Sequence, residues 1–206
     1  MKAIVVTDPM CSWCWGMASA VEEAASRLAG EVEFDFLLGG INTHGSQFIG
    51  DYGKRHLFKI WHEVQATTGQ TFGFRLPEQF VYNSTLPCIA VQIMRERLDK
   101  PPFGYLHRLQ QLFFEHGVNI NDAEVLADAA SEFGWQRREF LSALGDTEVS
   151  ECVADDFACS RSYGTNALPN VLWERDGERA LLAGGYADAD MLVELIRARK
   201  NSPAPA

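Results

Sequence analysis

A pair of cysteines lies between a predicted buried strand and a predicted helix near the start of the chain. Residues 2–7 (KAIVVT) form a short β-branched run, which is typical of a strand buried on both faces of a sheet. The segment CSWC follows at residues 11–14, and residues 12–28 carry apolar side chains at helical spacing. Residues 32–38 (VEFDFLL) predict a second strand. This order predicts a right-handed βαβ unit with both cysteines at the start of its helix.

The position of the two cysteines suggests redox chemistry. We expect Cys11 at the helix tip, where unpaired backbone N–H groups and the positive end of the helix dipole favour a thiolate. Cys14 lies one turn further along on the same side, so it can attack a mixed disulfide formed at Cys11. Cys11 is therefore the expected nucleophile and Cys14 the resolving thiol. A structural zinc site, which needs four ligands, and a pair of inert core thiols are the alternatives.

The rest of the chain predicts helices and a second pair of strands. Helices are expected over residues 54–67, 85–98, 105–116, 123–133, 135–144, 147–163 and 188–200. Ser84 or Thr85, Asn121 and Asp188 are their expected N-caps, and Gly164-Thr165-Asn166 is expected to end the helix over 147–163. Strands are expected over 170–174 and 179–183, joined by an Asp-Gly turn.

The order of these elements predicts an α/β thioredoxin fold with a large α-helical insertion. A mixed sheet of four strands would carry helices on both faces. Residues 1–45 and 146–200 are expected to form a discontinuous thioredoxin-like domain, and residues 46–145 the helical insertion domain. Residues 201–206 are expected to be a disordered tail, because they are polar and rich in proline.

Four further residues are candidates for substrate contacts. X–Pro bonds are usually trans, and only the fold assignment favours a cis bond at Pro169. Such a bond would bring the backbone of Leu168 beside Cys11 as an edge for a substrate peptide. Ser12 and Trp13 lie between the cysteines, and we expect them to tune the thiolate, with Trp13 forming an exposed apolar rim.

The sequence gives weaker evidence for a functional role of the remaining cysteines and of Asp8. Asp8 precedes Cys11 by three positions and either relays protons, opposes the thiolate electrostatically or is an ordinary strand-end residue. Cys88, Cys152 and Cys159 are expected to be structural. Cys152 and Cys159 share a helix face, but about 10 Å along the axis separates them, which is too far for a disulfide.

Histidine and aromatic residues of the middle region are also candidates. The five histidines are scattered, and we expect each to lie at the surface or to be satisfied by local contacts: His44, His56, His62, His107 and His116. Trp15 is expected to pack in the core or against the insertion. An aromatic loop either lines a cleft or lies on the core, and it contains Phe72, Phe74, Phe80 and Tyr82.

Composition limits the partners and the compartment. The formal net charge is −10, from 18 basic and 28 acidic residues, which disfavours binding to nucleic acid and to anionic membranes. No apolar run is long enough for a transmembrane helix, and the N-terminus lacks a signal-peptide pattern. Five cysteines are too few for a disulfide-stapled secreted scaffold, and their number is odd. We therefore expect a cytoplasmic protein.

The motifs together resemble a known family. DPMCSWCWG after the first strand, GTNALPNVLW late in the chain and the helical block between them resemble DsbA-family thiol–disulfide oxidoreductases. LGGIN, TGQTFGF, FVYNSTLPC and GVNINDAEVLADAASEFG are similar to the FrnE-like cytoplasmic branch. That branch shares its scaffold with kappa-class glutathione transferases and hydroxychromene-carboxylate isomerases. The resemblance covers about residues 2 to 197.

The resemblance implies a Cys11–Cys14 redox pair, a cis bond at Pro169, and a protein or small-molecule thiol or disulfide as substrate. No organic cofactor or metal is expected, and glutathione is an open co-substrate. The direction of exchange and the oligomeric state stay open. One alternative is a glutathione-dependent isomerase or transferase acting on a small aromatic molecule, with the aromatic loop and the histidines forming its pocket. Those enzymes usually carry serine where Cys11 stands. Another alternative is a binding module without redox activity.

Overall fold

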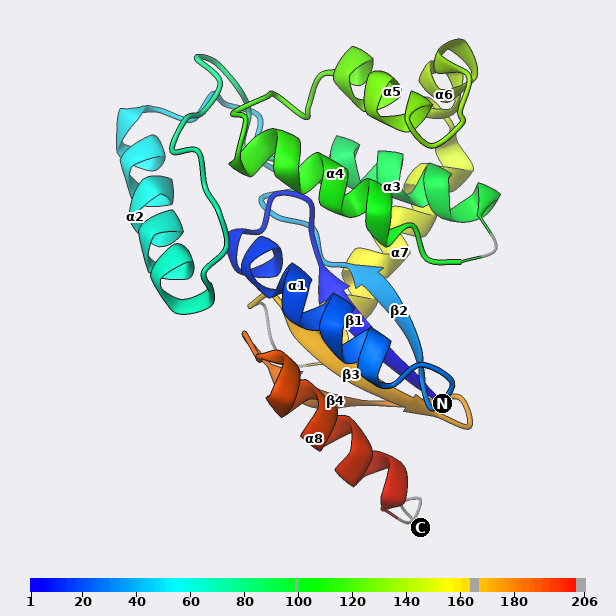
Figure 1. The fold of residues 1–206 in the computed structure, drawn as a ribbon. Coiled ribbons are helices and arrows are strands. Elements are labelled where there is room, and N and C mark those ends of the chain that lie inside the picture. The colour runs from blue at the N-terminus through cyan, green and yellow to red at the C-terminus, as the bar shows by residue number, and fades with distance from the viewer. Residues whose placement is uncertain (99, 164–166, 203–206) are drawn as a thin grey trace.

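The computed structural model describes residues 1–98, 100–163 and 167–202, and its centre is a four-stranded sheet (Figure 1). The strands lie in the order β2-β1-β3-β4. β2 runs parallel to β1, while β3 is antiparallel to both of its neighbours. Their bounds are Lys2–Thr7 for β1, Glu33–Leu38 for β2, Asn170–Arg175 for β3 and Glu178–Gly184 for β4.

The register of the sheet gathers three chain segments at one edge. Thr7 at the end of β1 pairs with Leu38 at the end of β2, and Val6 pairs with Asn170 at the start of β3. The residues after β1, the residues after β2 and the residues before β3 therefore leave the sheet at the same edge. The cysteine pair follows β1 directly and belongs to this edge.

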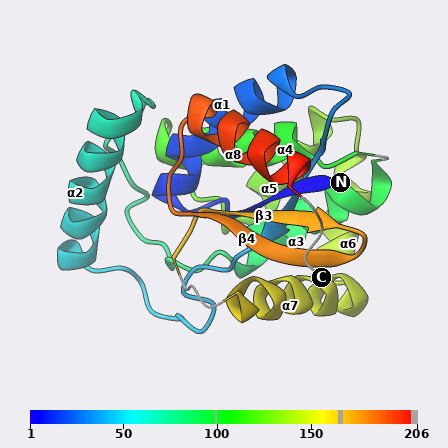
Figure 2. The same cartoon turned by 90° about the horizontal axis from the view of Figure 1, so that it is seen from below.

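Helices cover both faces of the sheet. Helix α1 (Ser12–Arg27) and helix α8 (Ala189–Asn201) lie together on one face, and α7 (Thr147–Ser162) lies on the other (Figures 1 and 2). Each has buried apolar residues at helical spacing, as in Val149, Val153 and Phe157 of α7.

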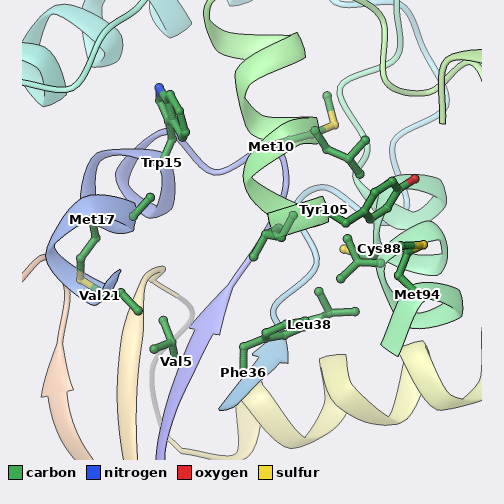
Figure 3. Close-up of a cluster of buried hydrophobic side chains, with 14 of the residues drawn as sticks. Val5, Met10, Trp15, Met17, Val21, Phe36, Leu38, Cys88, Met94 and Tyr105 are labelled. Atoms are coloured by element: carbon green, nitrogen blue, oxygen red, sulfur yellow. The ribbon is translucent and has the colours of Figure 1, made fainter. Parts of the chain in front are cut away.

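A helical insertion between β2 and α7 lies beyond the edge of the sheet at which the cysteine pair follows β1 (Figure 1). Its helices are α2 (Asp51–Thr68), α3 (Thr85–Arg97), α4 (Phe103–Phe114), α5 (Ala123–Ser131) and α6 (Arg137–Ala143). The insertion shares its core with the sheet and α1. Figure 3 shows this joint cluster, which contains Val5, Met10, Trp15, Met17, Val21, Phe36, Leu38, Cys88, Met94 and Tyr105.

The expected thioredoxin fold with a helical insertion is confirmed, and a few details of its helices differ. Helix α5 is capped by Asp122, whose Oδ1 accepts from the Glu124 N–H, whereas the Asn121 amide donates to the Val81 carbonyl. Helix α8 extends through Asn201, so the expected tail is shorter at its start. The expected helix stop at Gly164-Thr165-Asn166 and the tail residues 203–206 lie outside the described residues. The predicted domain boundaries stay predictions.

Within the described ranges, no helix has both the length and the apolar character needed to cross a membrane.

Candidate active site

Cys11 is the N-cap residue of helix α1. Its backbone is extended (φ −84°, ψ 114°), and its Sγ accepts a hydrogen bond from the Cys14 N–H at 3.1 Å. A thiol sulfur therefore takes the place that a serine or aspartate oxygen usually takes at a helix start. This N–H group and the helix dipole stabilise negative charge on the sulfur. The local geometry suits a nucleophilic thiolate.

Cys14 lies one turn into the helix and is buried. Burial raises the pKa of its thiol well above the ordinary value, and the neighbouring Cys11 and Asp8 raise it further, while the Thr7 hydroxyl lowers it. All five cysteines lie among the described residues and are free thiols. The two sulfurs are thus unequal, because a charge on Cys11 disfavours a second charge on Cys14.

A cavity of about 370 Å³ lies beside Cys11. It is bounded by the tip of α1, the segment after β2, the end of α7 and the segment before β3. Its lining residues are Cys11, Gly39, Gly40, Ile41, Asn42, Ser160, Arg161 and Leu168. We call it the Cys11 cavity. A molecule in this cavity would lie next to Cys11.

Two glycines permit the close packing of this cavity wall. A Cβ at Gly39 would lie 2.5 Å from the Leu168 Cδ1 atom. Gly40 has a φ of +71°, and a Cβ there would lie 2.8 Å from the Phe157 ring. The two glycines that follow β2 therefore belong to the wall of the Cys11 cavity.

The Leu168–Pro169 peptide bond is cis, as the family resemblance implies. Leu168 borders the Cys11 cavity, while Pro169 borders a much smaller cavity that Cys14 also lines. The structure therefore brings both residues to the cysteine pair. Their contact with substrate stays a prediction.

Ser12, Trp13 and Trp15 are not among the lining residues of the Cys11 cavity. Ser12 is buried, and Trp13 is half-buried because its ring packs against Tyr186 at 6.1 Å between centroids. Trp13 is thus less exposed than the expected apolar rim, and its contact with substrate stays a prediction. The Trp15 ring is buried, and its Nε1 donates to the Thr71 carbonyl at 2.9 Å, which confirms packing against the insertion.

Asp8 is fully buried and organises the segment before Cys11. Its Oδ1 accepts from the Met10 N–H at 2.7 Å, and its Oδ2 accepts from the Ser84 hydroxyl at 2.6 Å and the Ile41 N–H at 3.1 Å. The Cys88 thiol lies 3.6 Å from the same Oδ2. Burial raises the pKa of Asp8 despite these hydrogen bonds. Asp8 thus connects the strand end, the cavity wall and helix α3, and it is a positioning residue.

Asp8→Ala is expected to lower the free energy of unfolding by about 2–4 kcal/mol at neutral pH. It removes the acceptor of the buried Met10 N–H and of the Ser84 hydroxyl, and the Ile41 N–H keeps only the Ser84 Oγ as acceptor. The folded-state pKa of Asp8 lies above its ordinary value of 3.8. Protonation of Asp8 therefore stabilises the folded protein. This contribution is fully present below pH 3.8 and is lost as pH rises through the pKa of Asp8 in the folded state. The difference in the free energy of unfolding between the wild type and Asp8→Ala should therefore become smaller as pH increases from 4 to 7.

Urea unfolding at several pH values measures this difference. Asp155→Ala, at an exposed position of α7, is the control and should change stability by less than about 0.5 kcal/mol. A gap between wild type and Asp8→Ala that widens with pH would contradict the assignment of Asp8.

The aromatic loop lies on the core and does not line the Cys11 cavity. Phe72 and Phe80 are buried against rings of α2 and α4, such as Trp61 and Phe113. The Tyr82 hydroxyl donates to the Met10 carbonyl at 2.9 Å. Of the two alternatives left open by the sequence, the position on the core is the one observed, and the Tyr82 hydrogen bond connects the loop to the segment before Cys11.

The histidines, like the aromatic loop, are not among the lining residues of the Cys11 cavity. His107 pairs with Glu22 at 2.7 Å, and His62 stacks on Phe74 with ring centroids 4.1 Å apart. Burial lowers the pKa of His107, with Glu22 opposing the shift. None of the five is a lining residue of the cavity at Cys11. Among the described residues, no three His, Cys, Asp or Glu side chains converge at metal-ligand distance.

Comparisons with known proteins identify the family of the chain and solved structures of similar fold. Residues 3–197 match the family model described as DSBA-like thioredoxin domain. No curated protein sequence matches the chain. A protein from Nitrosomonas europaea, described as a candidate protein disulfide isomerase, has a TM-score of 0.85 at 23% identity, with 98% of this chain and 100% of that one covered.

Two further solved structures share the fold. The cytosolic disulfide reductase DsbM from Pseudomonas aeruginosa has a TM-score of 0.78 at 23% identity, covering 97% of this chain and 98% of its own, and it is also solved with GSH. A 2-hydroxychromene-2-carboxylate isomerase has a TM-score of 0.63 at 12% identity, covering 97% and 94%. At these identities the likeness concerns the fold.

Proposed function

Because the chain belongs to the DSBA-like thioredoxin domain family, we propose that it is a thiol–disulfide oxidoreductase whose redox pair is Cys11 and Cys14. One observation carries the proposal: the Cys11 sulfur accepts the Cys14 N–H at the start of α1 and borders a cavity large enough for a small ligand. A nucleophile, a resolving thiol and space for a substrate occur together there.

The reaction proceeds in two exchange steps. The Cys11 thiolate attacks one sulfur of a substrate disulfide, forms a mixed disulfide and releases the first substrate thiolate. Cys14 then loses its proton and attacks the Cys11 sulfur, which releases the second substrate thiol and leaves a Cys11–Cys14 disulfide. The substrate gains two electrons and the cysteine pair loses two. The reverse sequence oxidises a dithiol.

The unequal environments of the two sulfurs suit this order. The raised pKa of Cys14 keeps it protonated while Cys11 is charged. Formation of the mixed disulfide removes the charge on Cys11 and one cause of the shift, so Cys14 ionises more readily when it is needed. Leu168 and Pro169 would hold the substrate beside the pair.

The proposed reaction uses no organic cofactor or metal, because the cysteine pair carries both electrons. Glutathione would enter as a co-substrate thiol. We place the protein in the cytoplasm, acting on protein or small-molecule thiols and disulfides, with no nucleic-acid or membrane partner. Its similarity to the cytosolic reductase DsbM and its net charge of −10 support this placement.

A glutathione-dependent isomerase or transferase is the second candidate, supported by the similarity in fold to the 2-hydroxychromene-2-carboxylate isomerase. Burial of Phe72 and Phe80 removes the aromatic pocket that this candidate needs at the cysteines. Glutathione-dependent turnover of a small aromatic substrate that survives Cys14→Ser would favour it. A binding module without redox activity would instead capture its partner in either oxidation state.

Equilibration in glutathione redox buffers tests the proposal. We expect tryptophan fluorescence to change in a single two-electron transition, because Trp13 lies between the cysteines and Trp15 follows Cys14 directly. A midpoint near about −270 mV indicates a reductase, and one between about −180 and −120 mV indicates an isomerase or an oxidant. The double variant Cys11→Ser/Cys14→Ser is the control and should show no transition. Absence of a transition in the wild type over this range would discard the redox assignment.

A further inference from the structure

Among the described residues that line the Cys11 cavity, one is charged: Arg161, near the end of helix α7. Its guanidinium carbon lies 5.8 Å from the centroid of the Phe157 ring. Within the described part of the chain, no carboxylate lies within ion-pair distance of it, in contrast to Arg95 and Arg179, which pair with Asp35 and Glu174. Arg161 is therefore an exposed cation without a carboxylate partner among the described residues, and it lines the same cavity as Cys11.

The other polar side chains that the structure describes in this lining, Asn42 and Ser160, each donate a hydrogen bond within the protein. The Asn42 amide donates to the Tyr82 carbonyl at 2.7 Å, and the Ser160 hydroxyl donates to the Phe157 carbonyl at 3.0 Å. The Ile41 N–H donates to Asp8. Among the described lining side chains, the Arg161 guanidinium is the one that carries several N–H donors, and a guanidinium binds a carboxylate through two parallel hydrogen bonds.

We propose that Arg161 is a specificity residue that selects small disulfide substrates bearing a carboxylate near the reacting sulfur. The proposal rests on the proposed function and adds a substrate class to it. The cavity volume of about 370 Å³ lies in the range of small-molecule sites. The remainder of the protein carries an excess of negative charge, which repels an anionic substrate, so a local cation is needed to reverse that preference at Cys11.

Three disulfides that differ mainly in charge test this. 3,3′-Dithiodipropionate is anionic, bis(2-hydroxyethyl) disulfide is neutral, and cystamine is cationic. Each oxidises the reduced protein under pseudo-first-order conditions, and each rate constant is divided by the rate with free dithiothreitol to remove intrinsic reactivity. We expect the wild type to prefer the anionic over the neutral and the cationic disulfide.

Arg161→Ala is expected to lower the anionic-to-neutral ratio by about 5- to 10-fold, as for loss of one partly screened charge contact. Arg161→Lys should retain part of the preference, and Arg161→Glu should reverse it toward cystamine. Arg138→Ala removes an exposed arginine on α6 and gives the same net charge, so it controls for the global field. Thermal unfolding of each variant checks that the fold is kept.

The outcomes separate the two proposals. An anionic-to-neutral ratio that is equal in Arg161→Ala and Arg138→Ala overturns the role of Arg161, while reaction of the wild type with the neutral disulfide still supports the oxidoreductase. A wild type that reacts with none of the three disulfides overturns the proposed function itself.

Discussion

Cys11→Ser is expected to abolish disulfide exchange, with a loss of at least about a thousandfold, the order seen when a catalytic nucleophile is removed. A serine hydroxyl can still accept the Cys14 N–H and cap helix α1. It does not ionise at neutral pH, so it cannot attack a disulfide sulfur. The variant should therefore fold as the wild type does and lack the chemistry.

Insulin reduction and refolding of reduced, denatured ribonuclease measure this loss. Cys152→Ser is the matched control, because Cys152 is exposed on α7 and does not line the Cys11 cavity. It undergoes the same chemical change and should keep full activity. A Cys11→Ser protein as active as Cys152→Ser would remove Cys11 from the mechanism.

Much of the fold could be predicted from the sequence because its signals are local. The β-branched run before CSWC predicts β1, and the helical spacing after it predicts α1, so the cap position of Cys11 follows from neighbouring residues. The same holds for Asp188, whose side chain accepts from the Met191 N–H at the start of α8. Asn121 shows the limit of local signals, because the adjacent Asp122 is an equally good cap.

The walls of the Cys11 cavity could not be predicted in this way. They come from segments that the sheet register joins, since Thr7 pairs with Leu38 and brings Gly39 and Gly40 beside the cysteines. Arg161 enters from a helix on the opposite face of the sheet from α1, and no sequence motif marks it. Residues so far apart in the sequence form no local pattern from which their proximity could be predicted.

Asp8 and the aromatic loop illustrate the same limit. The carboxylate binds the Ser84 hydroxyl, 76 positions later, so its role depends on the docking of α3. Closely spaced aromatic residues are compatible with either a cleft or a core. Phe72 joins the core because Trp61 and Phe114 present rings to it from α2 and α4. Only the packing of three insertion segments decides that choice.

Cys14→Ser is expected to stop the reaction halfway and accumulate a mixed disulfide between Cys11 and its substrate. Cys11 keeps the Cys14 backbone N–H as a hydrogen-bond donor, because the substitution changes only the side chain at position 14. The first attack therefore proceeds. The second step requires a thiol one helical turn from Cys11, and a serine there cannot form the internal disulfide that releases the substrate.

Intact-protein mass spectrometry after reaction with a small disulfide measures this species, which should account for most of the protein within one turnover and disappear on reduction. The double variant Cys11→Ser/Cys14→Ser is the control and should form no adduct.

In the wild type, the release step should accelerate as pH rises, because the pKa of Cys14 is raised and its thiolate fraction limits attack. In Cys14→Ser no such acceleration is expected. Release at the wild-type rate from Cys14→Ser would show that another group resolves the intermediate, and the exposed Cys152 and half-buried Cys159 lie on α7 as the thiols to substitute next.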